Sequence, residues 1–194
     1  MNIEKDDFDH FMDLPSKLRK KIINDPELLK ELVRKNISAH RYAHSLSVAD
    51  CAVQLALAHH VDPRKAYYAG LLHDCTKGLP EEVHDAYFRY YDPDKINYPT
   101  GVKHSFSAKY YLKEKLNFHD KDILNAIYNH TICQSRDKLS LILYICDKRE
   151  PLRQIDDDIL EIARHDLYRA YELLNKDVER YLNDRKERFI KNSL

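Results

Sequence analysis

Residues 71–78, LLHDCTKG, place a histidine, an aspartate and a lysine inside an otherwise apolar stretch. The imidazole of His73 and the carboxylate of Asp74 can bind a metal ion or transfer a proton. Lys77 follows His73 by one helical turn, so its ammonium group can reach the same space. A histidine–aspartate pair alone is common on surface helices. Its meaning therefore depends on which other side chains the fold brings to it.

Further polar residues lie on the apolar faces of the helices that the sequence predicts. Asp147 follows Leu139 and Leu143 at helical spacing, at the end of the run LSLILYIC, so its carboxylate points where the leucines point. A carboxylate there is costly unless it is paired or bound to a metal. His130 follows Ile127 at i+3, so its side chain also lies on an apolar face. The full inward-facing set of metal-ligand type is His44, His73, Asp74, His104, His130 and Asp147.

Each of these residues has an ordinary structural explanation when it is taken alone. A buried histidine is often satisfied by a carbonyl oxygen, and Asp147 could pair with a nearby arginine. Together, on separate predicted helices, the six favour a shared metal site. The other histidines neighbour charged or loop residues, and we expect them at the surface, with His40 left open because it lies one turn before His44. They are His10, His40, His59, His60, His84, His119 and His165.

The composition argues against several functional classes. Lys plus Arg and Asp plus Glu both number 32, so no net field draws the chain to nucleic acid or to a membrane surface. Three glycines are too few for a Walker A loop or a dinucleotide-binding loop. The four cysteines are widely spaced, which is typical of buried thiols in a reducing compartment. With no apolar run near ~20 residues and no leader-like segment, we expect a cytoplasmic protein.

Helical periodicity and helix caps predict an all-α fold. Few glycines and abundant Leu, Ala, Lys and Glu favour helices over tight hairpins. Asp-Pro pairs at residues 25–26 and 62–63 are typical helix starts, as is Asp120, and Gly78 is a candidate helix end. We expect helices at 38–60, 62–78, from 80 onward, 104–117, 120–130, 138–149, 157–166 and 167–191, with a loop at 92–103.

Five short motifs occur in a fixed order between residues 41 and 153: RYAHS, LLHDCTK, HS, AIYNHT and CDKREPLR. Together they resemble the HD superfamily of metal-dependent phosphohydrolases, and within it the YqeK-type symmetrical diadenosine tetraphosphate hydrolases. The resemblance implies an HD-domain helical bundle, which we expect over residues 37–194. Residues 1–36 have no clear counterpart in the family pattern, and their own sequence predicts a short helical N-terminal appendage. The resemblance also implies hydrolysis of diadenosine tetraphosphate, and of related dinucleoside polyphosphates, symmetrically into two ADP.

The resemblance further implies two transition-metal ions that share one bridging ligand. The first ion is held by His44, His73, Asp74 and Asp147, and Asp74 bridges to a second ion held by His104 and His130. Mixed nitrogen and oxygen ligands without thiolate favour iron, with manganese as the alternative, and they do not exclude catalytic zinc. A hydroxide that bridges the ions would be the nucleophile.

Three basic residues are candidates for substrate binding: Arg41, Lys77 and Arg153. Lys77 can meet a phosphate oxygen as negative charge develops, and the two arginines can each grip a flanking phosphate. Asp74 and Lys77 are the candidate catalytic residues. For Arg41, Arg153 and Glu150 an exposed ion pair is an equal alternative, while Glu150 can also orient a ligand histidine.

Other functions stay open at this point. A nucleotidase or dNTP phosphohydrolase of the same superfamily would differ in its products. A metal-dependent nucleotide sensor without turnover would bind nucleotide and release nothing. A helical bundle with satisfied core histidines would hold no metal. We expect no nucleic acid or membrane partner, and the sequence leaves both a monomer and a homodimer open.

Overall fold

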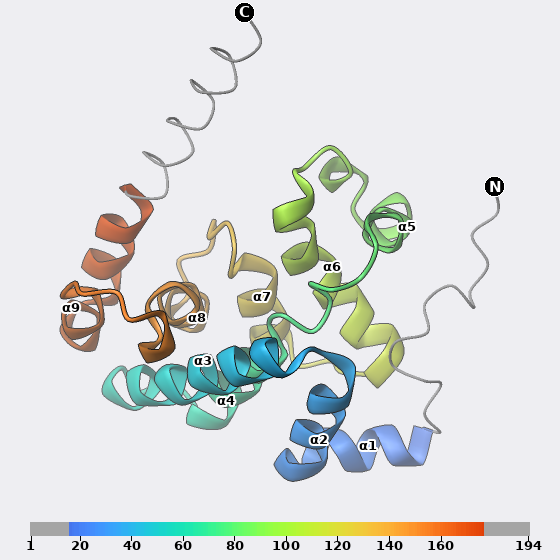
Figure 1. Cartoon of the computed structure of the whole chain (residues 1–194), viewed down its shortest axis with the longest axis horizontal. Helices are drawn as coiled ribbons and strands as arrows, with labels where there is room; N and C mark the ends of the chain where they lie inside the picture. The colour runs from blue at the N-terminus through green and yellow to red at the C-terminus, as the bar shows by residue number, and fades with distance from the viewer. Residues whose placement is uncertain (1–15, 177–194) are drawn as a thin grey trace, which may run out of the picture.

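The computed structural model describes residues 16–176, and every regular element in that range is a helix, which confirms the all-α prediction (Figure 1). The α-helices are α1 (Ser16–Asn24), α2 (Pro26–Asn36), α3 (Ala39–Ala58), α4 (Pro63–Leu72), α5 (Glu81–Tyr91), α6 (Thr100–Leu116), α7 (Lys121–Asn129), α8 (Lys138–Arg149) and α9 (Ile159–His165). Two 3₁₀-helices, η2 (Pro93–Lys95) and η3 (Pro151–Arg153), lie between them. Residues 167–176 are also helical.

Aspartate caps set several of the helix starts at the predicted places. The Asp25 carboxylate accepts hydrogen bonds from the backbone N–H groups at the start of α2, and Asp120 does the same for α7. Asp62 caps α4 in the same way. Asp137 caps α8, whose bounds equal the predicted 138–149.

Within the described range we find no helix with the length and hydropathy that crossing a bilayer requires.

Helix α4 ends at Leu72, whereas the sequence predicts an end near Gly78. Nδ1 of His73 lies 2.7 Å from the carbonyl oxygen of Gly70, the acceptor that the Asp74 N–H would use in a continuing α-helix. Residues 73–78 instead form tight turns, closed by bonds such as Lys77 N–H to Asp74 O at 3.1 Å. Three residues per turn align side chains i and i+3, so Lys77 projects in line with Asp74.

The predicted loop at 92–103 is shorter than expected. The 3₁₀-helix η2 occupies its beginning, and α6 already starts at Thr100 with Pro99 as its N-cap. Lys103, expected in the loop, is therefore a buried helical residue, and its ammonium group pairs with Glu81 at 2.6 Å and with Asp85 at 2.7 Å.

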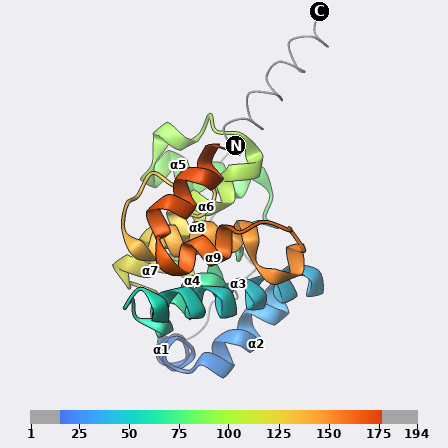
Figure 2. The same ribbon diagram turned by 90° about the vertical axis from the view of Figure 1, so that its left-hand side faces the viewer.

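The core surrounds α8, which is buried at every position from Leu139 to Asp147. Helix α3 lies alongside α4 in both views of the molecule (Figure 1, Figure 2). The two backbones approach so closely that a Cβ atom added at Gly70 would lie 2.5 Å from the Cα of Ala49. This contact brings the start of α3 next to the turn that follows α4.

Helices α1 and α2 pack beneath the α3–α4 pair (Figure 1). Leu29 and Val33 of α2 are fully buried in the same core cluster as α3 and α4. His10, the acidic N-terminal stretch and the end of the helix predicted at 167–191 lie outside the described residues.

Candidate metal centre

The six inward-facing residues of metal-ligand type come from five different parts of the chain and meet in one place. His44 lies on α3, and His73 and Asp74 follow the end of α4. His104 lies on α6, His130 follows the end of α7, and Asp147 lies in the last turn of α8. All are buried except His44, which is partly exposed. The structure therefore joins every residue that the sequence singled out for metal binding.

Asp74 is fully buried at the centre of this group. Its Oδ1 atom faces three imidazole Nε2 atoms, at 3.2 Å for His104 and 3.7 Å for both His73 and His130. Burial raises the pKa of the Asp74 carboxyl, but the neighbouring imidazoles outweigh burial and hold that pKa below its ordinary range. Asp74 is therefore an ionised carboxylate surrounded by nitrogen donors.

The other oxygen of Asp74 faces two cations. Oδ2 lies 3.0 Å from Nη1 of Arg41 and 3.1 Å from Nζ of Lys77. The alignment of Lys77 with Asp74 follows from the tight turns after α4. One carboxylate thus separates a side of imidazoles from a side of basic groups.

Asp147 forms the second acidic position. Its Oδ1 lies 3.2 Å from Nε2 of His44 and 3.6 Å from Nε2 of His73. Burial lowers the pKa of His73, but the carboxylates of Asp74 and Asp147 outweigh burial and raise that pKa above its ordinary value. Positive charge is therefore favoured between the two carboxylates, and a divalent cation would supply it.

Hydrogen bonds at the outer ring nitrogens fix which imidazole atom points inward. Nδ1 of His73 donates to the carbonyl oxygen of Gly70 at 2.7 Å, and Nδ1 of His130 donates to that of Ile127 at 2.6 Å. Because Nδ1 carries the proton in the neutral ring, Nε2 keeps its lone pair. Burial lowers the pKa of His130 and lowers that of His104 to about 4, which favours the neutral imidazole that a metal binds.

Two buried atoms in the centre lack the hydrogen bonds that buried polar atoms normally have. They are Nε2 of His73 and Oδ1 of Asp74. Nε2 of His104 lies 3.2 Å from that oxygen, but the two atoms are not aligned for a hydrogen bond. A metal ion would satisfy both. The donor atoms form two overlapping groups, each within 4.8 Å: His44, His73 and Asp147, and His73, Asp74 and His130.

A further layer of contacts holds the ligand residues. Oε1 of Glu150 lies 3.0 Å from Nδ1 of His44, while Oε2 accepts from Ser47 Oγ at 2.6 Å. Lys148 donates to the carbonyl oxygen of His130 at 2.9 Å and lies 3.5 Å from Asp147 Oδ2, so it ties α7 to α8. The sequence patterns assign no role to Ser47, and they include Lys148 only as part of the motif CDKREPLR. The spacing of Ser47, three residues after His44, is the one local signal that could have indicated its role.

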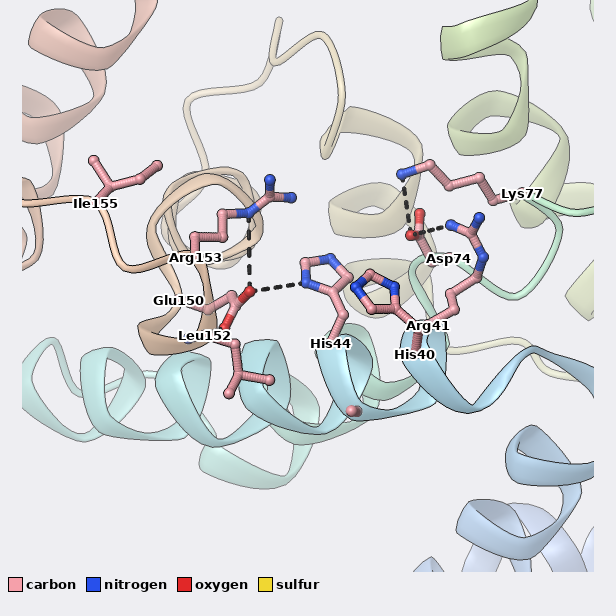
Figure 3. Close-up of a pocket in the computed structure, with 10 residues that line it drawn as sticks. His40, Arg41, His44, Asp74, Lys77, Glu150, Leu152, Arg153 and Ile155 are labelled. Atoms are coloured by element: carbon pink, nitrogen blue, oxygen red, sulfur yellow. Dashed lines mark hydrogen bonds and ion pairs between the residues drawn. The ribbon is translucent and has the colours of Figure 1, made fainter.

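A cavity of about 630 Å³ opens above this centre (Figure 3). Arg41, Lys77 and Arg153, the predicted substrate-binding residues, all line it. Figure 3 shows Arg41 and Lys77 reaching Asp74 on one side of His44, with Arg153 on the other side. Nη2 of Arg153 lies 3.4 Å from Asp147 Oδ1.

Two of the remaining histidines behave differently from a plain surface group. His40 is exposed but lines the cavity. His84, expected at the surface, is only 2% exposed, because α5 packs against α6, and its Nδ1 lies 2.8 Å from Ser107 Oγ. Charged neighbours along the chain were therefore a poor guide to its burial.

Comparison with known proteins matches residues 41–152 to the HD domain. A Mycoplasma genitalium protein named "Probable nicotinate-nucleotide adenylyltransferase/Ap4A hydrolase" is 37% identical over 157 residues, which cover 74% of this chain and 44% of the relative. The Bacillus subtilis protein named "Bis(5'-nucleosyl)-tetraphosphatase, symmetrical" is 30% identical, over 71% of this chain and 77% of the relative. A crystal structure of a predicted HD superfamily hydrolase involved in NAD metabolism, from Clostridium acetobutylicum, has a TM-score of 0.77 and 30% identity, covering 84% of this chain and 89% of that one.

The fold, the buried histidine and aspartate cluster and the domain match together define the class: the chain belongs to the HD-domain family, a family of hydrolases that bind divalent metals. Within it, the chain belongs to the YqeK-type group, which includes the Bacillus subtilis relative. The chain spans about half the length of the two mycoplasma relatives, 44% of one and 51% of the other.

Proposed function

We propose that this protein hydrolyses diadenosine tetraphosphate, and related dinucleoside polyphosphates, symmetrically into two ADP. The observation that carries the proposal is the position of Asp74, whose two oxygens face imidazole donors on one side and two cations on the other. Hydrolysis of a polyphosphate needs both features, because metal ions activate water and basic side chains bind phosphate. The names of the relatives support the choice of substrate.

We assign the metal ligands as follows. His44, His73, Asp74 and Asp147 would hold one ion, and Asp74 would be shared with a second ion held by His104 and His130. The two groups of donor atoms overlap at His73, and neither includes His104. The place of His104 in the second set is supported by its Nε2 atom, which lies 3.0 Å from Nε2 of His130 and 3.2 Å from Oδ1 of Asp74. Nitrogen and carboxylate donors without thiolate favour iron, with manganese as the alternative. Two divalent ions held by these residues would lower the pKa of bound water and so supply the nucleophile for attack on phosphorus.

The basic residues bind and polarise the substrate. Lys77 donates to an oxygen of the phosphate under attack and Arg41 to a flanking phosphate, which is supported by their positions about Asp74 Oδ2 at 3.1 and 3.0 Å. In the substrate complex a phosphate oxygen competes with Oδ2 for these donors. Arg153 binds a phosphate on the opposite side of His44. With cations on both sides of the metals, the middle anhydride lies at the point of attack.

The domain boundaries and the cellular location are part of the same proposal. We retain residues 37–194 as the phosphohydrolase domain and residues 1–36 as its appendage, of which α2 packs Leu29 and Val33 into the core of the domain. The four cysteines are unpaired, which supports a reducing, cytoplasmic location.

The test is a product analysis with purified, metal-loaded protein. Diadenosine tetraphosphate should give ADP as the only nucleotide product. In water enriched in heavy oxygen, the label should enter one of the two ADP molecules, because one water is added for each bond broken. An ATP and AMP pair would contradict symmetrical cleavage. Phosphate release from mononucleotides would indicate a nucleotidase, and binding without turnover would indicate a sensor.

A further inference from the structure

Two exposed apolar side chains lie inside the cavity above the metal centre. Leu152 is 60% exposed and Ile155 is 48% exposed, and both line the cavity that Arg41, Lys77 and Arg153 also line. A single exposed leucine needs no explanation. Figure 3 shows these two aliphatic side chains apart, with Arg153 and Glu150 between them. They therefore offer two separate apolar contacts within a polar cavity, which is typical of a site that binds an organic ligand.

The segment that carries these side chains is tied to the proposed metal ligands. The N–H of Leu152 donates to Oε2 of Glu150 at 2.7 Å, and the other oxygen of Glu150 bonds His44. Nε of Arg153 donates to the carbonyl oxygen of Asp147 at 2.6 Å. Leu152 is therefore held at a set distance from the metal centre, as a group that positions a ligand must be.

The cavity has chemically different ends. Figure 3 shows Leu152, Arg153 and Ile155 on one side of His44, and Arg41 and Lys77 on the other side. A chain of phosphates that runs from Lys77 past the metals would reach Arg153 next. The group attached to the end of that chain would then lie over Leu152 and Ile155. In a nucleotide that group is a nucleoside, whose base offers a flat apolar face.

We propose that Leu152 and Ile155 bind the nucleobase of one half of the dinucleotide, while Arg153 binds the phosphates of that half. This inference rests on the proposed function. Contacts with these two side chains make the protein prefer nucleotides over inorganic phosphate chains, because inorganic chains carry no base that could contact them. The volume of about 630 Å³ lies within the usual range of small-molecule sites.

The experiment compares the binding of ADP with that of inorganic pyrophosphate, which carries the same number of phosphates and no base. Dissociation constants are measured by calorimetry on the metal-loaded protein and on Leu152→Ser, Ile155→Ser and the double variant. Leu57→Ser is the matched control, because Leu57 is 56% exposed on α3 and does not line the cavity. Leu152→Met, which keeps an apolar side chain, tests whether the apolar character of this position determines ADP binding.

We expect the parent protein to prefer ADP, and the double variant to bind ADP about tenfold or more weakly, as expected when two aliphatic contacts are lost. Pyrophosphate binding should change by less than about twofold on this basis, since its phosphate contacts are kept. The control and Leu152→Met should resemble the parent. Equal loss of both ligands, unchanged ADP binding, or a parent without preference for ADP would overturn the inference.

The outcome separates this inference from the proposed function. If the parent does not hydrolyse diadenosine tetraphosphate but the variants lose the preference for ADP, the base site stands and the proposed reaction does not. If the parent gives two ADP but the variants keep their preference, the reaction stands and the base lies elsewhere. If both hold, KM for diadenosine tetraphosphate should rise in the variants by the same factor as the ADP dissociation constant.

Discussion

Glu150 holds the His44 ring in place, with its Oε1 atom 3.0 Å from Nδ1 of that ring. The carboxylate of Glu150 can only accept, so Nδ1 donates to it, and Nε2 on the other side of the ring lies 3.2 Å from Oδ1 of Asp147. Glu150 is only 2% exposed, and its second oxygen accepts from Ser47 and from the N–H of Leu152. One buried side chain therefore orients a proposed metal ligand and anchors the apolar side of the cavity.

Replacing this carboxylate should weaken metal binding. Glu150→Gln keeps the shape of the side chain but loses the negative charge that favours the Nδ1 proton, so we expect metal affinity or activity to fall by about 10- to 100-fold. Titration with metal and steady-state kinetics measure the two effects. Glu82→Gln, at an exposed position of α5, is the control. Parent-like affinity in Glu150→Gln would show that the His44 ring needs no carboxylate partner.

Asp74 should be needed for both ions, because we assign it as the bridge. Asp74→Ala should lose most of the bound metal and most of the activity together. Elemental analysis per chain, on protein purified without chelators, measures the first effect. Asp94→Ala, an exposed aspartate in η2, should keep the parent's metal content. Full occupancy in Asp74→Ala would argue against the bridging role.

Lys77 should act on the reaction and leave the metals in place. Lys77→Ala should lower kcat by about 10²-fold, a typical loss for one contact to developing charge, with metal content unchanged. Lys20→Ala on α1, also exposed, is the control. A parallel loss of metal and rate would mean that the contact of Lys77 with Asp74 at 3.1 Å is structural.

Gly70 should be needed for the close contact between α3 and α4. A Cβ atom there would lie 2.5 Å from the Cα of Ala49 and 2.7 Å from its N, both backbone atoms that give way only if a helix moves. Gly70→Ala should lower the free energy of unfolding by about 1–3 kcal/mol, as overpacking does. Gly101→Ala is the matched control, since nothing lies within 4 Å of its added Cβ. Its free energy of unfolding should rise slightly, because alanine favours helix over glycine. Equal stability of the two variants, measured by denaturant titration, would contradict the close contact.

His84 should make the fold sensitive to acid. Burial lowers its pKa to about 4, against about 6.5 in an unfolded chain. Between these values the unfolded chain binds more protons, so the contribution of a neutral His84 is fully present above about pH 6.5 and is lost as the pH falls toward 4. His84→Gln removes this dependence, so the difference in unfolding free energy between parent and variant should shrink over that range. A difference that stays constant from pH 7.5 to pH ~4.5 would mean that His84 titrates alike in both states.

The sequence alone was sufficient for the fold class, for most helix starts and for the six residues of the candidate metal centre. Helix starts are local, since an aspartate bonds N–H groups two or three residues away, as Asp120 does for α7. The inward direction of Asp147 is also local, because it follows from the leucines that precede it on one helix. The ordered family motifs predicted which of these residues share a metal ion.

The tertiary structure decided what no local pattern contains. His44 and Glu150 lie 106 residues apart, and only packing of α3 against the end of α8 brings their side chains together. The burial of His84 depends on the packing of α5 against α6, which places it beside Ser107. The placing of Leu152 and Ile155 in the cavity also required the fold. Each of these features is a contact set by three-dimensional packing. The strength of such a contact depends on burial and geometry, which a linear pattern does not contain.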